Sequence, residues 1–223
     1  MPTPFEQNNN TTATYHEAIA FYQNLAASYS QLELKTYGAT DSGHPLHLAI
    51  LSKDEDFDPE SIRRKGKNVL LINNAIHPGE PCGVDATMLF LRDLLTQKER
   101  QTLLEKTVII AIPVYNIGGA LNRNSTTRAN QNGPASYGFR GNARNLDLNR
   151  DFIKCDSRNA QTFNQLFNEW NPTIFVDNHT SNGADYQYTM TLIATQHSKL
   201  SPPLATYLQE SLLPRLYREM DNR

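Results

Sequence analysis

The sequence predicts an α/β fold with a mixed, largely parallel central sheet and helices on both faces. Three apolar runs, 69–72, 108–112 and 173–176, have the composition of strands that are buried on both faces. Segments with helical periodicity lie between these runs, and strands that alternate with helices are typical of a largely parallel sheet. The chain has 223 residues, of which 39% are hydrophobic, so it can form one sizeable core.

The first predicted elements are a helix and two short strands. Thr14 and Glu17 have the spacing of a capping box, and a one-sided apolar stripe follows them. Strands are expected over 32–37 and 46–52, joined by a turn. The charged stretch 53–67 has mixed signs, and we expect it to be a solvated loop.

The remaining elements alternate along the chain. After the strand at 69–72, a helix should begin near Pro81, because proline suits the first turn of a helix. Another helix is expected over 157–170, between the strands at 108–112 and 173–176. A fourth strand over 189–195 and a last helix near 204–212 complete the pattern. We expect a polar tail over 1–13 and a single domain over 14–223.

Charge and composition exclude several classes of protein. Lys and Arg number 21 against 23 Asp and Glu, so the formal net charge of −2 gives no bulk attraction to nucleic acid or anionic lipid. No apolar run approaches the roughly 20 residues that span a bilayer. The N-terminal segment has no basic-then-apolar signal peptide. We therefore expect a soluble chain that binds neither nucleic acid nor membrane, with a cytoplasmic location by default.

Residues 114–156 interrupt the alternation with a long polar loop. The segment holds eight asparagines and five arginines and has almost no apolar periodicity. Loops beyond about 12–15 residues are uncommon in compact domains and are usually functional or disordered. The Asn and Arg content favours ordered hydrogen bonding to an anionic or polar ligand. The alternative is a flexible surface insertion.

His77 and Glu80 lie where a predicted buried strand ends and a helix begins. Ligands of open α/β proteins bind at this carboxyl edge of the sheet. An imidazole and a carboxylate three residues apart, across a Pro-Gly turn, can converge on one Zn²⁺ ion. The spacing alone is common, and the simpler interpretation is a solvated histidine with a glutamate at a helix N-terminus.

His179 changes this balance, because it follows another predicted strand at the same edge of the sheet. Two histidines and one glutamate form a set of three ligands that leaves a fourth position for water, as in catalytic zinc sites. The other four histidines are interpreted as ordinary strand-edge or surface residues. The two cysteines, Cys82 and Cys155, are too few for a structural zinc ribbon and are interpreted as semi-buried thiols.

Four motifs occur in order along the chain, namely HPGE at 77–80, PVYN at 113–116, DLNR at 147–150 and DNH at 177–179. Together they resemble the zinc carboxypeptidase family, of the pancreatic carboxypeptidase A type. The similarity extends from the first helix to about residue 195. It implies one Zn²⁺ per chain, held by His77, Glu80 and His179, and a peptide substrate with a free C-terminal carboxylate.

The resemblance also assigns roles to residues of the long loop. Asp147 matches the carboxylate that orients the first zinc histidine. Asn149 and Arg150 match the pair that binds the terminal carboxylate of the substrate. Arg128 is similar to the catalytic arginine that polarises the scissile carbonyl and stabilises the oxyanion. The spacing around it differs from the family pattern, so Arg123 is a rival for this role.

The chain departs from the family after His179. A substrate-capping tyrosine and a catalytic glutamate, which acts as general base and then as acid, belong downstream of the last zinc histidine in the family. The later carboxylates are Asp185, Glu210, Glu219 and Asp221, and none lies on a predicted strand. We therefore expect a truncated domain without these two residues and without the final strands and helix. An exposed sheet edge would then promote self-association.

These features predict a zinc metallocarboxypeptidase that removes the C-terminal residue of a peptide by means of metal-activated water, with doubtful activity in this chain. The sequence does not separate ordinary peptides from cell-wall peptides as substrates. Two alternatives stay open. One is an N-acyl amino acid amidohydrolase of the aspartoacylase or desuccinylase type, which shares the His-x-x-Glu…His layout. The other is a non-catalytic module that binds zinc or peptide.

Overall fold

The computed structural model describes residues 1–222, which form two compact units that divide after Gly183. The first unit holds a sheet with helices on both faces, and the second holds short helices only. The elements of the first unit are α1 (Pro4–Gln7), α2 (Tyr15–Ser28), β1 (Leu32–Ala39), β2 (Pro45–Leu51), α3 (Pro59–Arg64), β3 (Asn68–Asn73), α4 (Cys82–Thr96), η1 (Lys98–Leu104), β4 (Thr107–Ile112), α5 (Ile117–Leu121), η2 (Leu148–Arg150), α6 (Arg158–Trp170) and β5 (Ile174–Asp177).

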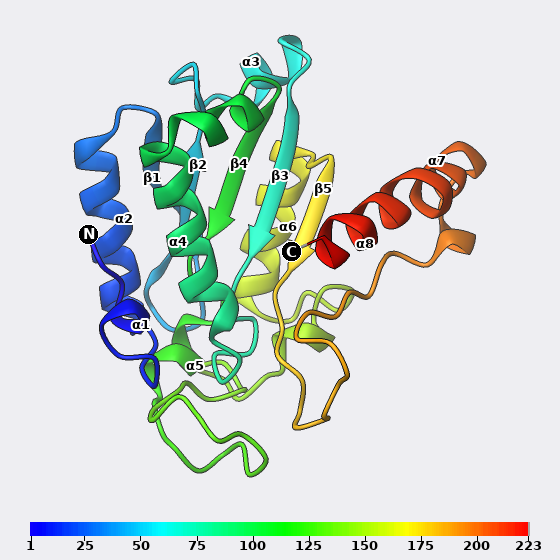
Figure 1. Ribbon diagram of the computed structural model, residues 1–223. Coiled ribbons are helices and arrows are strands. Elements are labelled where there is room, and N and C mark those ends of the chain that lie inside the picture. The colour runs from blue at the N-terminus through cyan, green and yellow to red at the C-terminus, as the bar shows by residue number, and fades with distance from the viewer. Residues whose placement is uncertain (223) are drawn as a thin grey trace. The chain divides into compact units, whose positions relative to one another are not determined.

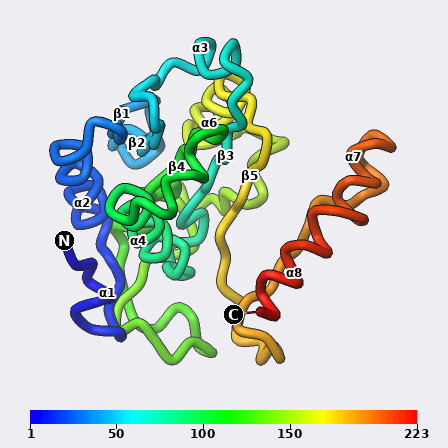
Figure 2. Tube along the Cα trace, turned by 45° about the horizontal axis from the view of Figure 1, so that its top comes forward, coloured from blue at the N-terminus to red at the C-terminus, as the bar shows by residue number. Residues whose placement is uncertain are grey.

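The sheet is mixed, as the sequence predicts. Its strand order is β1-β2-β4-β3-β5. The pairs β1–β2 and β2–β4 are antiparallel, whereas β3 is parallel to both β4 and β5. The three apolar runs thus form the parallel half of the sheet, and their carboxyl ends meet at one edge, as the views of Figures 1 and 2 show.

Helices cover both faces of the sheet, which confirms the predicted layers. Helices α2 and α4 lie on one face, and α6 lies on the other (Figure 1). Strand β4 shows why its sequence is apolar throughout. Ile109 and Ala111 point into the core beneath α2 and α4, whereas Val108, Ile110 and Ile112 point into the core beneath α6. Since both faces are buried, no polar residue alternates in this strand.

Local signals set the ends of the predicted helices. In α2, Thr14 Oγ1 accepts a hydrogen bond from the Glu17 backbone N–H, and the Glu17 carboxylate accepts one from the Thr14 N–H at 2.8 Å. This is the predicted capping box. Ser157 caps α6, and Asn171 ends it in the left-handed conformation with φ of 42°. Asparagine tolerates that conformation better than most residues with a side chain.

Two sequence predictions in the element order are wrong. The expected loop at 53–67 contains helix α3, because Asp58 caps it and Ile62 is buried in the core beneath α6. The expected strand at 189–195 is absent from the described residues, and this stretch has no regular structure. Its threonines favour extended backbone, but a strand also needs a partner to pair with, and none of the described strands pairs with this stretch.

The two ends of the chain also hold helical structure. The tail over 1–13 includes α1, which has a capping box of its own between Thr3 and Glu6. The second unit contains η3 (His197–Lys199), α7 (Pro202–Tyr207), η4 (Leu208–Leu212) and α8 (Leu213–Asp221), which extend beyond the predicted helix. Across residues 1–222, no helix combines the length and the apolar character that crossing a membrane requires.

Candidate functional site

Three side chains converge at the carboxyl edge of the parallel strands. His77 and Glu80 lie on the turn between β3 and α4, and His179 lies just after β5. One potential ligand atom from each residue falls within 4.8 Å of the others. His77 Nδ1 lies 3.2 Å from Glu80 Oε1, and His179 Nδ1 lies 3.0 Å from Glu80 Oε2. The side chains of His77 and Glu80 are 3% exposed and that of His179 is 36% exposed, so the group is open to solvent on one side.

The turn that carries His77 and Glu80 depends on close backbone packing. The Glu80 N–H donates to the His77 carbonyl at 2.8 Å, which closes the turn. A Cβ on Gly79 would lie 2.6 Å from Arg128 Cδ and 3.1 Å from the Gly138 carbonyl oxygen. Glycine therefore allows the long loop to approach the turn that carries His77 and Glu80.

Each histidine has a carboxylate on the side away from Glu80. His77 Nε2 lies 3.0 Å from Asp147 Oδ1, and His179 Nε2 lies 3.0 Å from Asp177 Oδ2. A carboxylate only accepts hydrogen bonds, so both Nε2 atoms carry a proton. The Nδ1 atoms face Glu80 at the centre of the group, which is the arrangement that metal-binding histidines adopt.

The group fits a divalent metal ion such as Zn²⁺ on the chemistry of its donors. The buried Nδ1 of His77 makes no hydrogen bond within the described part of the chain, although it lies near Glu80. A buried nitrogen lone pair with no donor is destabilising unless it coordinates something. Two imidazole nitrogens and a carboxylate are ordinary zinc ligands, and they leave a fourth position free.

Electrostatics keep this group charged in the metal-free chain. Burial alone would raise the pKa of Glu80, but the hydrogen bonds from His179 and the Thr180 N–H, together with the nearby His77 ring, lower it well below its usual value. Hydrogen bonds to Asp177 and Glu80 raise the pKa of His179 to about 9, against a smaller opposing effect of burial. Metal binding through His179 Nδ1 would therefore require the loss of a proton from this nitrogen.

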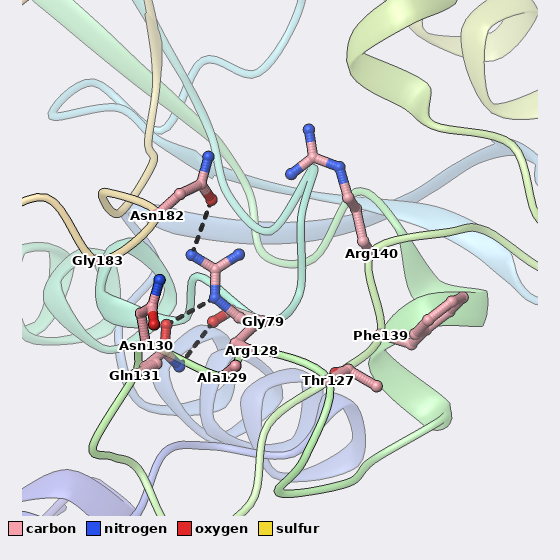
Figure 3. A pocket seen from close by; sticks show the side chains of 11 residues that line it. Gly79, Thr127, Arg128, Ala129, Asn130, Gln131, Phe139, Arg140, Asn182 and Gly183 are labelled. Carbon is pink, nitrogen blue, oxygen red and sulfur yellow. Dashed lines mark hydrogen bonds between the residues drawn. The ribbon is translucent and has the colours of Figure 1, made fainter.

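Arg128 reaches this group from the long loop and lines a cavity of about 400 Å³. Its Nη1 donates to Glu80 Oε1 at 3.0 Å, and its Nε donates to Gln131 Oε1 at 2.7 Å. Its Nη2 donates to the Ser181 carbonyl and to Asn182 Oδ1, at 3.1 and 3.2 Å. Figure 3 shows the guanidinium held between Gln131 and Asn182. Arg128 is thus a cation fixed beside the candidate metal site.

Arg123, the other candidate for the catalytic arginine, does not contact Glu80. Its guanidinium donates to the side chain and the carbonyl of Ser136, within the long loop. It lines a different hollow, together with Glu17 and residues of the N-terminal segment. Of the two arginines, the structure brings only Arg128 to Glu80.

Arg140 is a second cation at the site. The sequence places it among the arginines of the long loop but gives it no role of its own. Its Nε donates to Asp147 Oδ2 at 3.0 Å, and its Nη1 lies 3.6 Å from Glu80 Oε1. Burial would raise the pKa of Asp147, but the hydrogen bond with His77 and the Arg140 charge lower it. Sequence spacing could not predict this position of Arg140, because the conformation of the long loop places it beside Glu80.

The predicted carboxylate-binding pair lies close to the site in sequence but outside the cavity. Arg150 is exposed, and its Nη1 donates to the carbonyl of Asn149 at 2.9 Å. The Asn149 N–H donates to Asp147 Oδ1 at 3.0 Å. Neither Asn149 nor Arg150 is among the described residues that line the cavity beside Arg128.

The later carboxylates belong to the second unit. Asp185, Glu210, Glu219 and Asp221 are all exposed and follow Gly183, where the two units divide. The unit that holds His77, Glu80 and His179 includes none of them. No role in the candidate site is therefore assigned to them.

Comparison with known families identifies the class to which this fold and site belong. The zinc carboxypeptidase family model matches residues 18–210, which include every residue of the His-Glu-His group. The chain therefore belongs to the zinc carboxypeptidase family. Comparison with curated protein sequences gives no match.

Solved carboxypeptidases share the fold. The metallo-carboxypeptidase from Burkholderia cenocepacia superposes with a TM-score of 0.60 at 17% identity, over 78% of this chain and 43% of that chain. The metallo-carboxypeptidase from Pseudomonas aeruginosa, solved with (2-guanidinoethylmercapto)succinic acid, gives 0.59 at 20% identity, over 78% and 41%. Carboxypeptidase A from Helicoverpa armigera gives 0.55 at 16% identity, over 77% and 46%. The aligned region thus spans less than half the length of each solved chain.

Proposed function

We propose that the chain carries the metal-binding part of a zinc metallocarboxypeptidase, which removes the C-terminal residue of a peptide. The observation that carries the proposal is the convergence of His77, Glu80 and His179, in which both histidines are oriented by carboxylates. Membership of the zinc carboxypeptidase family supports the same metal and the same class of substrate.

His77, Glu80 and His179 would hold one Zn²⁺ ion per chain. When bound, the ion supplies a Lewis acid for the scissile carbonyl and a water of lowered pKa. Asp147 keeps the proton of His77 on Nε2, which leaves Nδ1 free to act as a ligand. Asp177 does the same for His179.

Arg128 would stabilise the charge that develops on the scissile carbonyl oxygen. Its guanidinium lies 3.0 Å from Glu80 and lines the cavity, so a substrate carbonyl beside the metal would lie within its reach. Fixed donors aimed at a developing oxyanion make a large contribution to hydrolysis. The side chain needs little rearrangement, because Gln131 and Asn182 already hold it.

Asn149 and Arg150 would bind the terminal carboxylate of the substrate. A guanidinium beside an amide can bind a carboxylate through two parallel hydrogen bonds. Within the described residues Arg150 donates to a neighbouring backbone carbonyl through Nη1, so its other donors are available to a ligand.

We assign the general base to no residue of this chain. The family match favours the peptidase over the N-acyl amino acid amidohydrolase. The non-catalytic binding module stays as the second candidate, because the four later carboxylates are exposed residues of the second unit.

Zinc stoichiometry of the purified chain tests the proposal. We expect one Zn²⁺ per chain, lost in His77→Ala and retained in His197→Ala, whose histidine is a residue of the second unit. Peptide hydrolysis measured on the same samples separates the two candidates. Turnover would place a base within this chain, whereas zinc without turnover agrees with a chain that lacks the general base. Absence of zinc from the unsubstituted chain would contradict the proposed function.

A further inference from the structure

Asn73 is the last residue of strand β3, and Asn74 follows it directly. Asn73 and Asn74 are both fully buried, after a run of apolar residues from Val69 to Ile72. A buried amide is tolerated only where its polar atoms find partners. The partners of these two amides therefore indicate why polar residues occupy these positions.

The register of the sheet sets Asn73 against Asp177. Strands β3 and β5 are parallel, and Asn73 and Asp177 are directly paired at their carboxyl ends. Asn73 Nδ2 donates to Asp177 Oδ1 at 3.0 Å. The other oxygen of Asp177 lies 3.0 Å from His179 Nε2. An unbroken chain of hydrogen bonds thus runs from the core of the sheet to a residue of the His-Glu-His group.

The orientation of the Asn73 amide is fixed by this contact. Rotation of the amide would place its oxygen against the oxygen of Asp177, and two acceptors repel. In the observed orientation Asn73 Oδ1 is buried and has no hydrogen-bond partner among residues 1–222. The side chain therefore leaves one acceptor unpaired while its donor is used on Asp177, which points to the Asp177 contact as its purpose.

Asn74 fixes Asn178, the residue that lies between Asp177 and His179. Its Oδ1 accepts from Asn178 Nδ2 at 2.8 Å and from Thr87 Oγ1 at 3.1 Å. The Asn178 N–H donates to the Asn73 carbonyl at 3.0 Å. A Cβ on Gly83 would collide with Asn178, so α4 also packs tightly against this turn. The backbone that carries Asp177 and His179 is thus anchored independently of the Asn73 side chain.

We propose that Asn73 is a positioning residue for the metal site, and that it acts through Asp177 on the ring of His179. Held by Asn73, the Asp177 carboxylate keeps the His179 proton on Nε2 and turns Nδ1 towards Glu80. Mutation of the hydrogen-bond partner of a metal-binding histidine commonly lowers metal affinity by about 10–100-fold. This inference rests on the proposed function, because it assumes a metal ion at His77, Glu80 and His179.

Zinc affinity, measured by competition with a chromophoric chelator, tests the proposal. We expect Asn73→Ala to weaken Zn²⁺ binding by about 10-fold and Asp177→Ala by about 10–100-fold. The double variant should be no weaker than Asp177→Ala, because the two residues act in one path. In Co²⁺-loaded protein, Asn73→Ala should also alter the visible absorption bands, which report the ligand geometry.

Thr87→Val is the matched control, since it removes a hydrogen bond from the same buried amide network without touching Asp177. It should destabilise the fold and leave zinc affinity unchanged. If Asn73→Ala does not fold, Asn73→Leu, close in volume and also without a donor, replaces it. Equal affinities for the Asn73 and Thr87 variants, or additive effects of Asn73 and Asp177, would overturn the proposal alone. No zinc binding by the unsubstituted chain would overturn the proposed function as well.

Discussion

Gly79 shows how one residue allows the long loop to meet the turn that carries His77 and Glu80. We expect Gly79→Ala to destabilise the fold by about 1–3 kcal/mol, the usual effect of overpacking, because its Cβ would lie 2.6 Å from Arg128 Cδ. Urea unfolding measures this loss. In an Arg128→Ala background the same substitution should cost less, since the colliding atoms are gone. Equal losses in both backgrounds would show that contact with Arg128 does not require the glycine.

Replacement of the Asp147 carboxylate by an amide should have a large effect on zinc affinity. Asp147→Asn keeps the shape of the side chain, but its amide can donate to His77 Nε2 and so favour the wrong tautomer. We expect zinc affinity to fall by about 10–100-fold. Arg140→Gln, which removes only the cation 3.0 Å from Asp147, should have a smaller effect. A larger loss in the Arg140 variant would mean that charge at Glu80 outweighs orientation of His77.

The residues of the site divide according to whether they carry a sequence signal. His77, Glu80 and His179 follow strands that can be predicted from apolar runs, so their meeting at one sheet edge can be inferred from the sequence alone. Asn73 and Arg140 carry no comparable signal. Their contacts with Asp177 and Asp147 depend on strand register and on the fold of a long loop, and neither can be read from spacing.

The elements divide in a similar way. The interior strands β3 and β4 are predictable because burial on both faces makes them apolar throughout. Helix α3 has too few apolar residues for a clear period, and its stability comes from the Asp58 cap and from Ile62. The stretch at 189–195 shows the opposite error, because β propensity without a pairing partner does not make a strand.

Helix α3 also gives the element for which pH dependence can be worked out. Hydrogen bonds from Lys65, and then from Ser61, lower the pKa of Asp56 from 3.8 to about 2. A carboxyl whose folded pKa is depressed stabilises the fold above its unfolded pKa, and the effect is lost as pH falls towards the folded value. Wild type should therefore exceed Asp56→Asn in unfolding free energy at pH 5, and the difference should shrink between about pH 4 and pH 2.

Urea unfolding of both proteins at closely spaced pH values measures this difference. Asp54→Asn is a matched control, since Asp54 is also paired with a lysine, but with Lys67 rather than with Lys65. In an Asp54→Asn background, Asp56→Asn should lower the unfolding free energy by the same amount as it does in the wild type. A difference that stays constant from pH 5 to pH 3 would contradict the role of the Asp56 charge.

At the scale of the whole molecule, metal binding should couple to global stability. The site gathers several carboxylates. In the metal-free chain their charges are balanced by arginines and by a protonated histidine. An ion that binds only the folded state adds about 2.7 kcal/mol of stability at 100 times its Kd. Zinc should thus raise the Tm, and a chelator should reverse the rise. In His77→Ala the Tm should not respond to zinc, and an equal response there would place the binding elsewhere.

The outer strand of the sheet predicts how the chain behaves at high concentration. Within the described residues β5 pairs only with β3, and Ile174 and Val176 are 45% and 38% exposed. An edge strand with exposed apolar side chains can pair with another copy through its outer edge. Light scattering should therefore give masses above 25.2 kDa that rise with concentration.

Ile174→Lys should suppress this association, because a charged edge resists pairing. Leu103→Lys is the control and should not suppress it, since Leu103 is 59% exposed but lies in η1. A monomer at every concentration, or equal suppression by both lysines, would contradict association through β5.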